Sequence, residues 1–309
     1  MNAVTLKIGV ASRLYSDPGG DAREIERLGY DYFAAGEHVA FNVPASNSFI
    51  SLAAAAGATT RIRLINAVAQ VPVYPAALLA KLSAALDVAS AGRFELGVGV
   101  GGEYPDEYEA CGVPVRERGA RMDEALKVIT RLLREDDVSF AGRFNRMQRI
   151  TIDPKPVQQP LPLWVSGRKE VAMRRAARHG SGWLPYMYTP EMVQRSLETI
   201  AAQRPAELPP IDAGLLIWGA VHRDAAVARQ MVAASLQRTY DQDFNRFVDA
   251  YCFAGTPEQV IRQLSRHVEA GVRTIILSFA CPDDQVNASR SLFTEQVLPV
   301  LRGLEHSNL

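Results

Sequence analysis

The sequence predicts an α/β fold, a (β/α)8 TIM barrel with insertions, formed by one domain over residues 1–309. One observation is a unit that recurs along the chain: a helical stretch, a glycine, then a short apolar strand. The other is the number of such strands, which a coarse count puts at eight. Short apolar strands that alternate with helices are typical of a parallel sheet covered by helices. Eight units over about 300 residues fit a TIM barrel, and a doubly wound open sheet is the alternative.

Each expected strand is a short apolar run bounded by turn residues or by the end of a helical stretch. In chain order the strands are Leu6–Val10, Tyr32–Ala35, Ile62–Val68, Phe94–Val98, Leu163–Val165, Gly182–Pro185, Ala213–Val221 and Thr274–Phe279.

Glycines end the helical stretches that precede several of these strands. The helices expected most clearly are Ala22–Leu28, capped by Asp21, Pro75–Ser90, Val171–His179 and one that starts at Thr256. In the last of these, Thr256 is the cap, a proline follows in the first turn, and Gln259 stands at the capping-box position.

Residues 103–160 depart from the repeating unit, and we interpret them as an insertion region. A polar, acidic loop over 103–113 leads into a long helix, Pro114–Glu135. Two short runs, Val138–Phe144 and Met147–Ile152, then predict a β-hairpin before the fifth strand. A proline-rich tether over 153–162 returns the chain to the barrel.

The composition excludes several classes of protein. The 34 basic and 34 acidic residues cancel, which argues against a partner of nucleic acid and against a protein held at a membrane by charge. Three widely spaced cysteines cannot build a disulfide framework or a closed zinc site. The N-terminus lacks the form of a signal peptide, and no apolar run reaches the roughly 18 residues of a spanning helix. We expect a soluble cytoplasmic enzyme.

In a TIM barrel the active site lies at the carboxyl ends of the strands, which reduces the candidates to a few. His38 follows the second strand, and a histidine there can exchange protons near neutral pH or serve only as a structural hydrogen-bonding group. Glu37 beside it is a weak candidate for the substrate pocket, and an orienting role is the stronger interpretation. No histidine or carboxylate spacing predicts a metal site.

Two further strand ends are candidates for cofactor binding. The segment from Asn66 through Ala67 and Val68 offers small residues that a flat ring could approach, although a plain strand end explains it equally well. Gly97–Gly102 formally satisfies the dinucleotide pattern G-x-G-x-x-G. Because no helix opens at its last glycine, a Rossmann site is disfavoured, and a glycine-rich strand end beside a cofactor is the better interpretation.

The fifth and sixth strands add an anion site and aromatic residues. Ser166, Gly167 and Arg168 form a small polar turn before a helix, where free N–H groups and the helix dipole favour phosphate; an ordinary βα turn is the alternative. Trp183 and Tyr186 follow the sixth strand and either line an apolar pocket or pack beneath a loop.

Taken together, these segments resemble the bacterial luciferase-like family of flavin and deazaflavin oxidoreductases. The resemblance runs along most of the chain and rests on the order of its pieces: Gly29–Asp31 leading to Gly36–His38, Leu86–Gly99, Gly112–Pro114, Arg118–Leu126, Pro154–Gln158, Leu163–Gly167, Arg175–Pro185 and Gly255–Glu258.

The resemblance implies a TIM barrel with a cofactor ring lying across the strand ends. It implies that His38 is the active-site histidine, and that a non-prolyl cis peptide stands behind the ring at the positions of Ala67 and Val68. It implies cofactor contacts from Gly99, Val100 and Gly101 and from the phosphate loop of Ser166, Gly167 and Arg168. It also implies a homodimer.

Two departures from the family bear on cofactor and substrate. Bacterial luciferase places an arginine for the flavin phosphate where this chain has Val100, which favours the deazaflavin, coenzyme F420. Sugar-phosphate dehydrogenases of that branch carry a catalytic glutamate where this chain has Gly102; Glu103 is adjacent and is a weak pocket candidate. The leading hypothesis is hydride transfer between F420 and a small organic substrate. An FMN-dependent monooxygenase and a non-catalytic cofactor-binding barrel are the alternatives.

Overall fold

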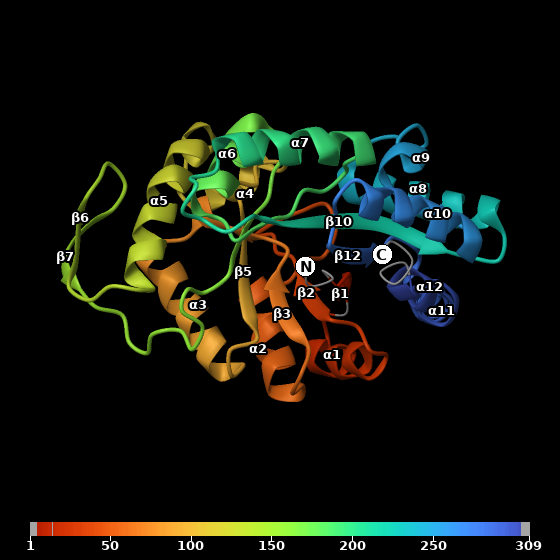
Figure 1. Ribbon diagram of the computed structural model, residues 1–309, viewed down its shortest axis with the longest axis horizontal. Coiled ribbons are helices and arrows are strands. Elements are labelled where there is room, and N and C mark those ends of the chain that lie inside the picture. Colours follow the sequence, from red (N-terminus) through yellow and green to blue (C-terminus); the bar gives the residue numbers. More distant parts are fainter. Residues whose placement is uncertain (1–4, 14, 304–309) are drawn as a thin grey trace.

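Eight parallel strands close into a barrel in the computed structural model, which describes residues 5–13 and 15–303 (Figure 1). Around the barrel they follow the order β10-β12-β1-β2-β3-β5-β8-β9, and β9 pairs with β10 to complete the ring. Their bounds are β1 Lys7–Ala11, β2 Tyr32–Ala35, β3 Arg63–Asn66, β5 Phe94–Gly99, β8 Leu163–Val165, β9 Gly182–Trp183, β10 Asp212–Val221 and β12 Thr274–Phe279. The predicted TIM barrel is confirmed, and the open-sheet alternative is wrong.

Two details of the sheet differ from the prediction. The expected strand Ile62–Val68 is divided, because a cis peptide bond between Ala67 and Val68 interrupts it after β3. Strand β4, Ala69–Gln70, then pairs with the end of β5. A short strand that was not predicted, β11 Phe253–Gly255, pairs with the last residues of β10.

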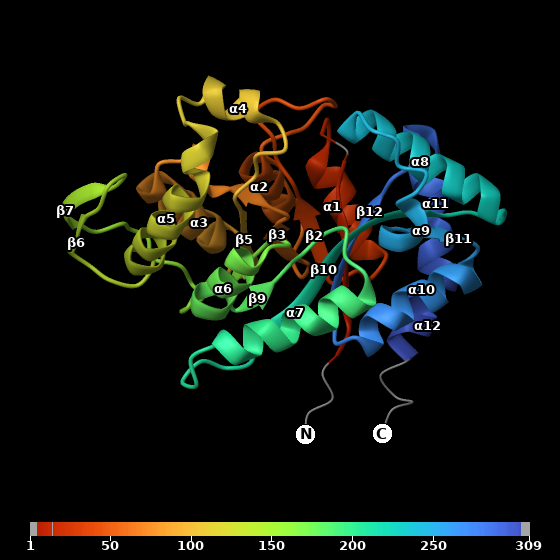
Figure 2. The same ribbon diagram turned by 90° about the horizontal axis from the view of Figure 1, so that it is seen from above.

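Helices surround the barrel (Figures 1 and 2). Their bounds are α1 Pro18–Arg27, α2 Ser48–Ala58, α3 Ala76–Ala89, α4 Pro105–Ala110, α5 Arg118–Leu132, α6 Glu170–His179, α7 Pro190–Gln203, α8 Ala225–Tyr240, α9 Val248–Tyr251, α10 Pro257–Glu269, α11 Asp283–Gln296 and α12 Leu298–Gly303, with short 3-10 turns at Val71–Val73 and Val115–Glu117.

Three helix predictions need correction, and one is confirmed. The cap of α1 is Asp17, whose carboxylate accepts the N–H of Gly20, whereas Asp21 lies inside the helix and pairs with Arg290. The expected loop over 103–113 contains α4, and the long helix begins at Arg118 after a 3-10 turn. At α10 the side chain of Gln259 accepts the N–H of the Thr256 cap, as the capping box requires.

The alternation of side chains along each strand divides the core into two parts. Residues such as Phe33, Leu64 and Phe94 point outward and pack against the helices. Their neighbours, among them Tyr32, Ile65 and Trp164, fill the inside of the barrel. Successive strand residues face opposite sides, so one apolar run supplies both cores, which explains why these strands are apolar throughout.

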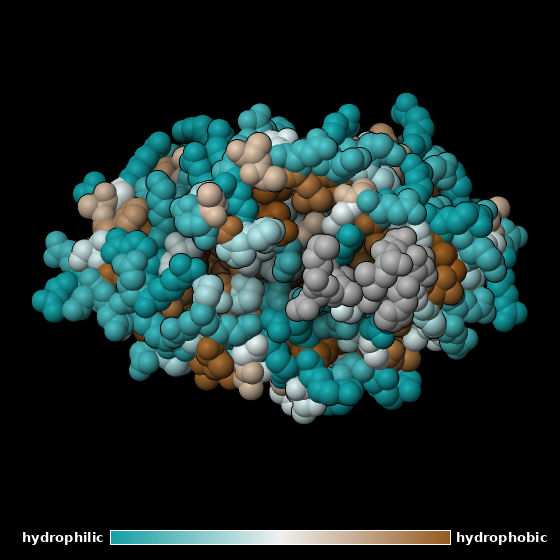
Figure 3. Space-filling model, in the orientation of Figure 1, coloured by the Kyte–Doolittle hydropathy of each residue, from teal (hydrophilic) through white to brown (hydrophobic). Residues whose placement is uncertain are grey.

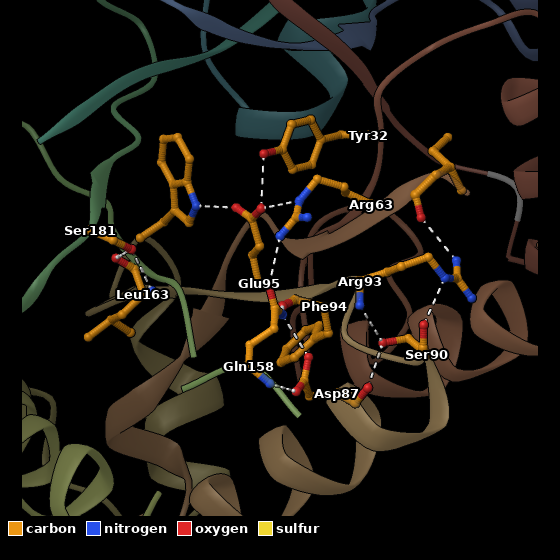
Figure 4. Close-up of polar contacts among 12 residues, drawn as sticks. Tyr32, Arg63, Asp87, Ser90, Arg93, Phe94, Glu95, Gln158, Leu163 and Ser181 are labelled. Carbon is orange, nitrogen blue, oxygen red and sulfur yellow. Dashed lines mark hydrogen bonds and ion pairs between the residues drawn. The ribbon is translucent and has the colours of Figure 1, made fainter. Parts of the chain in front are cut away.

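The amino end of the barrel is closed by a polar network around Glu95 (Figure 4). The Glu95 carboxylate, 4% exposed, accepts hydrogen bonds from the Tyr32 hydroxyl at 3.0 Å, from the Arg63 guanidinium and from the Trp164 indole. Arg63 also donates to Gln158, which comes from the proline-rich tether. A buried charge is tolerated only when it is paired and hydrogen-bonded, and this one is.

The predicted hairpin is present, formed by β6 Val138–Ala141 and β7 Arg146–Ile150, and it projects away from the barrel (Figure 1). Glu124 of α5 accepts the backbone N–H groups of three residues in its turn, 143–145. The division of the chain into one domain with an insertion at 103–160 stays a prediction.

The surface seen in the direction of Figure 1 is mostly hydrophilic, with apolar side chains gathered toward its centre (Figure 3). Within the described part of the chain, no helix has both the length and the apolar character needed to cross a membrane.

Candidate active site at the carboxyl end of the barrel

The loops that follow the strands gather at one end of the barrel, the end that carries α4 (Figure 2). Among them are the segment after β2 with Glu37 and His38, the turn after β8 with Ser166 and the segment after β9 with Tyr186. We call this end the mouth. It lies opposite the network around Glu95, because Tyr32 and Arg63 are the first residues of β2 and β3.

At the mouth, His38 is held by a buried carboxylate. Its Nδ1 lies 3.2 Å from Oε2 of Glu107, a residue of α4 that is fully buried. The same oxygen accepts the backbone N–H of Val39 at 3.1 Å. An ionised carboxylate only accepts hydrogen bonds, so Nδ1 carries the proton in this pair. The other ring nitrogen, Nε2, is then the atom free to exchange a proton with a ligand.

Gln70 and Phe41 complete the setting of the His38 ring. The amide nitrogen of Gln70 donates to the carbonyl of Glu37 at 3.3 Å. It also lies 3.1 Å from Nδ1, where a protonated Nδ1 accepts no hydrogen bond from it. The ring of Phe41 stacks on the imidazole, with centroids 3.9 Å apart and planes 9° from parallel. The contact with Glu107 and the stacked ring of Phe41 therefore hold the imidazole in one orientation.

Glu37 holds the loops of the mouth together. It is 8% exposed, and its Oε2 accepts from the backbone N–H and hydroxyl of Ser48, from Asn47 and from Tyr74, while its Oε1 accepts the N–H of Gln70. Both carboxylate oxygens are thus bound by the protein. This favours the orienting role over contact with a substrate.

The contact with Glu37 has an electrostatic effect on Tyr74. Burial, followed by the negative charge of Glu37, raises the pKa of the Tyr74 hydroxyl. Tyr74 therefore stays protonated and acts as a hydrogen-bond donor.

The predicted cofactor residues of β3 and β5 form a floor of small and apolar side chains. Val68 lies over β5, where a Cβ added at Gly99 would come within 2.7 Å of its methyl group. A Cβ at Gly97 would come within 1.8 Å of the carbonyl oxygen of Asn66, so only glycine permits this approach. A flat ring could rest on such a floor, and the cis bond at Ala67–Val68 stands where the family resemblance places it.

Asn66 differs from the expectation for this floor. Its side chain is fully buried, and its amide nitrogen donates to the hydroxyl of Ser48 at 2.8 Å, toward α2. Its amide oxygen is buried and has no hydrogen-bond partner among the described residues, and its contact with a cofactor stays a prediction. Val100 and Gly101 continue beyond the floor: the Val100 carbonyl accepts the hydroxyl of Tyr108, and Gly101 lies close to the side chain of Gln70.

The predicted phosphate loop, Ser166–Arg168, precedes a helix start that has no side-chain cap. Ser166 ends the strand side of the turn, Gly167 has a φ of +133°, and Lys169 begins α6 without a side-chain cap. An uncapped helix start presents backbone N–H groups that an anion can accept. The guanidinium of Arg168 is exposed, and it lies 5.0 Å from the centre of the Tyr186 ring.

The structure brings two of the weak pocket candidates together and separates a third. The Tyr186 hydroxyl donates to the carboxylate of Glu103, which joins the loops after β5 and β9. Trp183 is fully buried instead, and its indole donates to the carbonyl of Gly167 at 3.2 Å. Of the two interpretations given for Trp183, packing beneath a loop therefore fits its burial and its hydrogen bond to Gly167.

A row of aromatic rings beside His38 was not found from the sequence. Phe41 meets Tyr104 and Tyr240 edge to face at 6.3 and 6.0 Å, and Tyr240 meets Trp218 at 6.3 Å. These residues come from four separate segments, and Glu107 was hidden among several acidic residues of its loop. Only the acidic composition of that loop signals a partner for His38.

An open hollow of about 360 Å³ lies over the loop after β2. It is lined by residues 38–45, including His38 and Phe41, and the floor residues of β3 and β5 do not line it. Among residues 5–13 and 15–303, no cluster of histidine, cysteine and carboxylate side chains could hold a metal ion. Proton exchange and ring binding are the chemistry that the arrangement offers.

Comparisons with known proteins show which proteins the chain is similar to. The chain is 27% identical over 317 residues to the F420-dependent glucose-6-phosphate dehydrogenase of Intrasporangium calvum, a match that covers 90% of this chain and 92% of that protein. It is 25% identical over 323 residues to the FMNH2-dependent dimethylsulfone monooxygenase of Pseudomonas putida, covering 92% and 87%. A protein of Mycobacterium tuberculosis is 34% identical over 161 residues, and this match spans only 55% of its length.

Solved structures share the fold. The monooxygenase RslO1 of Streptomyces bottropensis superimposes with a TM-score of 0.83 at 26% identity, covering 96% of this chain and 99% of that one. An F420-dependent secondary alcohol dehydrogenase superimposes with a TM-score of 0.85 at 20% identity, with the same coverage. The family description "luciferase-like monooxygenase" matches residues 20–274, and the chain therefore belongs to the luciferase-like monooxygenase family.

Proposed function

We propose that the protein is an oxidoreductase that transfers a hydride between coenzyme F420 and a small organic substrate. The observation that carries the proposal is the pair of His38 and buried Glu107 at the mouth, beside a floor of small residues. A histidine whose Nδ1 is fixed by a carboxylate presents Nε2 in one orientation, which suits it to proton transfer.

The deazaflavin would supply a carbon that gives or takes a hydride, and the protein's own residues would do the rest. His38 would deliver or accept the matching proton at Nε2. Val68, with Gly97 and Gly99 beneath it, would support one face of the ring, and the turn at Ser166 and Gly167 would bind the cofactor phosphate. Glu37 would keep the loops in place without touching substrate.

One observation favours F420 over FMN. Val100 stands where bacterial luciferase has an arginine for the flavin phosphate. The nearly full-length matches do not separate the two cofactors, because they include an F420-dependent and an FMNH2-dependent enzyme. We propose F420 as the cofactor on the first ground.

The test is a titration of the purified chain with oxidised F420 and, separately, with FMN, followed by absorbance and fluorescence. Micromolar or tighter binding of F420, with FMN binding at least tenfold weaker, is the expected result. Assays with alcohols, enones and imines would then follow substrate-dependent change of the F420 absorbance. Preference for FMN would overturn the cofactor assignment.

The second candidate is an FMN-dependent monooxygenase. The match to the P. putida enzyme and the 26% identity to RslO1 favour it. Oxygen uptake that depends on substrate and on a supply of reduced FMN separates it from hydride transfer. A protein that binds a cofactor without any turnover would instead be the non-catalytic barrel.

We also propose a cytoplasmic homodimer, on the family resemblance alone. Sedimentation equilibrium at micromolar concentration should give twice the chain mass of 33.8 kDa. A single 33.8 kDa species at all concentrations would contradict it.

A further inference from the structure

Trp218 carries a buried hydrogen-bond donor without a partner. Among the described residues, no acceptor lies within reach of its indole nitrogen, which is shielded from solvent. The indoles of Trp164 and Trp183, in contrast, donate to Glu95 and to the carbonyl of Gly167. A buried donor left unsatisfied destabilises the fold, so such a group needs an explanation.

The position of Trp218 places this donor at the mouth. Trp218 is two residues beyond Leu216 on β10, and Leu216 packs among the residues inside the barrel. Side chains two apart on a strand share a face, so Trp218 also faces the interior, one layer closer to the carboxyl end. Its ring meets that of Tyr240, which in turn meets Phe41 beside His38.

The order of the strands places Trp218 across the mouth from Val68. Strand β10 is four steps from β3 in either direction around the eight-stranded ring, so the two strands face each other across the mouth. A cofactor ring on Val68 would leave its outer face turned toward Trp218. A substrate would therefore lie between the ring and the aromatic wall, with His38 at its side.

We infer that the substrate is a flat, conjugated or aromatic carbonyl compound whose oxygen accepts a hydrogen bond from the indole nitrogen of Trp218. The inference rests on the proposed function and narrows its substrate class. The wall beside His38 is built of the aromatic rings of Phe41, Tyr104 and Tyr240, which contact one another, and aromatic rings favour a planar ring as a further partner. The unpartnered donor requires an acceptor atom on the same molecule.

The test measures binding, so that it does not depend on turnover. Acetophenone has both features, ethylbenzene lacks the oxygen, and cyclohexyl methyl ketone lacks the flat ring. Their affinities would be measured by tryptophan fluorescence and calorimetry, with saturating F420 or FMN, whichever binds, and without cofactor if neither does. Acetophenone should bind about 3- to 10-fold more tightly than ethylbenzene, as one hydrogen bond predicts.

Substitution then assigns the hydrogen bond. Trp218→Phe keeps an aromatic ring but has no N–H, so it should remove the advantage of acetophenone over ethylbenzene and keep the advantage over the cyclohexyl ketone. Phe247→Leu is the matched control, because Phe247 belongs to the same set of rings but lies beyond Phe244, away from His38. The Phe247→Leu variant should show the same relative affinities for the three compounds as the wild type.

Three results would overturn the inference: equal binding of acetophenone and ethylbenzene, a preference that survives Trp218→Phe, or a loss of cofactor affinity in that variant of more than about threefold. Weaker cofactor binding by Trp218→Phe would indicate that the indole nitrogen donates to the cofactor instead of the substrate. If neither cofactor binds but the preference for acetophenone is present and depends on Trp218, the proposed function fails and the recognition of the carbonyl stands.

Discussion

The two ends of the barrel treat buried polar groups in opposite ways. At the amino end, Glu95 is bound by Tyr32, Arg63 and Trp164, so its charge is neutralised and its oxygens are occupied (Figure 4). At the mouth, the buried donor of Trp218 and the buried amide oxygen of Gln70 lack partners among the described residues.

This difference in hydrogen bonding indicates which end of the barrel binds a ligand. A network completed by the protein closes and stabilises one end of the barrel, whereas groups left incomplete at the other end have hydrogen bonds to offer. The predictions below test this division between a structural end and a chemical end.

The largest effect is expected from removing the proton-exchanging group at the mouth. His38→Ala should lower turnover about 10²- to 10⁴-fold, the contribution typical of general acid–base catalysis. Cofactor affinity should stay within about threefold, because His38 lies outside the floor and the phosphate loop. Steady-state kinetics and a cofactor titration measure both. His222→Ala, a half-buried position in the loop after β10 whose Nδ1 accepts the N–H of Asp224 in its own loop, is the control and should keep its turnover. Undiminished turnover in the His38 variant would remove His38 from the mechanism.

At the amino end, the same kind of change should affect folding instead. Glu95→Ala leaves Arg63 and the Trp164 indole without their acceptor, and we expect a loss of about 3 kcal/mol in the free energy of unfolding. Urea denaturation measures this loss. Turnover per folded molecule should be unchanged. A variant of normal stability and reduced turnover would contradict the structural role of this end.

A smaller catalytic effect is expected from Glu107, which acts through His38. Glu107→Gln keeps the shape but removes the acceptor charge, and turnover should fall about 10- to 100-fold with unchanged cofactor affinity. Glu109→Gln, an exposed position on the same helix, is the matched control. Equal turnover in the two variants would show that Glu107 does not orient the histidine.

The smallest effect concerns His267, a buried group at neither end. Burial, assisted by the charge of Arg266, lowers the pKa of His267 from 6.5 to about 4. Between pH 6.5 and 4, His267 is therefore protonated in the unfolded chain and neutral in the folded chain. The free energy of unfolding should fall by about 1–3 kcal/mol over that range.

Unfolding curves at several pH values check this expectation, and His267→Gln should flatten the pH dependence over that range. An unchanged slope would contradict it. The unpartnered Nδ1 of His267 would then need another explanation, and incomplete hydrogen bonding would be a weaker guide to ligand sites.

Much of the barrel could be predicted from the sequence, because each strand is apolar on both faces and each helix start or end has a local signal. Strand Tyr32–Ala35 and the cap at Thr256 are examples. Asp17 was missed as a cap because Asp21 offers the same chemistry four residues later. Strand β11 was missed because three residues carry no periodicity.

The site was less predictable, because its residues meet only through the closed fold. His38 and the phosphate loop are visible at strand ends, where the barrel rule points to them. The partner of His38 is 69 residues away and resembles its acidic neighbours, and Trp218 meets Tyr240 only in three dimensions. For Trp183, in β9, the sequence left pocket lining and packing beneath a loop both open, because an aromatic residue at a strand end gives the same pattern in either position.

We propose that the turn after β8 binds the cofactor phosphate, and a pair of variants at Ser166 tests this proposal. Ser166→Asp adds a negative charge to the turn, and Ser166→Asn alters the side chain without adding charge. In a titration with oxidised F420 and FMN, we expect at least tenfold weaker binding of the preferred cofactor by the Asp variant and a change within about threefold for the Asn variant. Wild-type affinity in Ser166→Asp would contradict the claim.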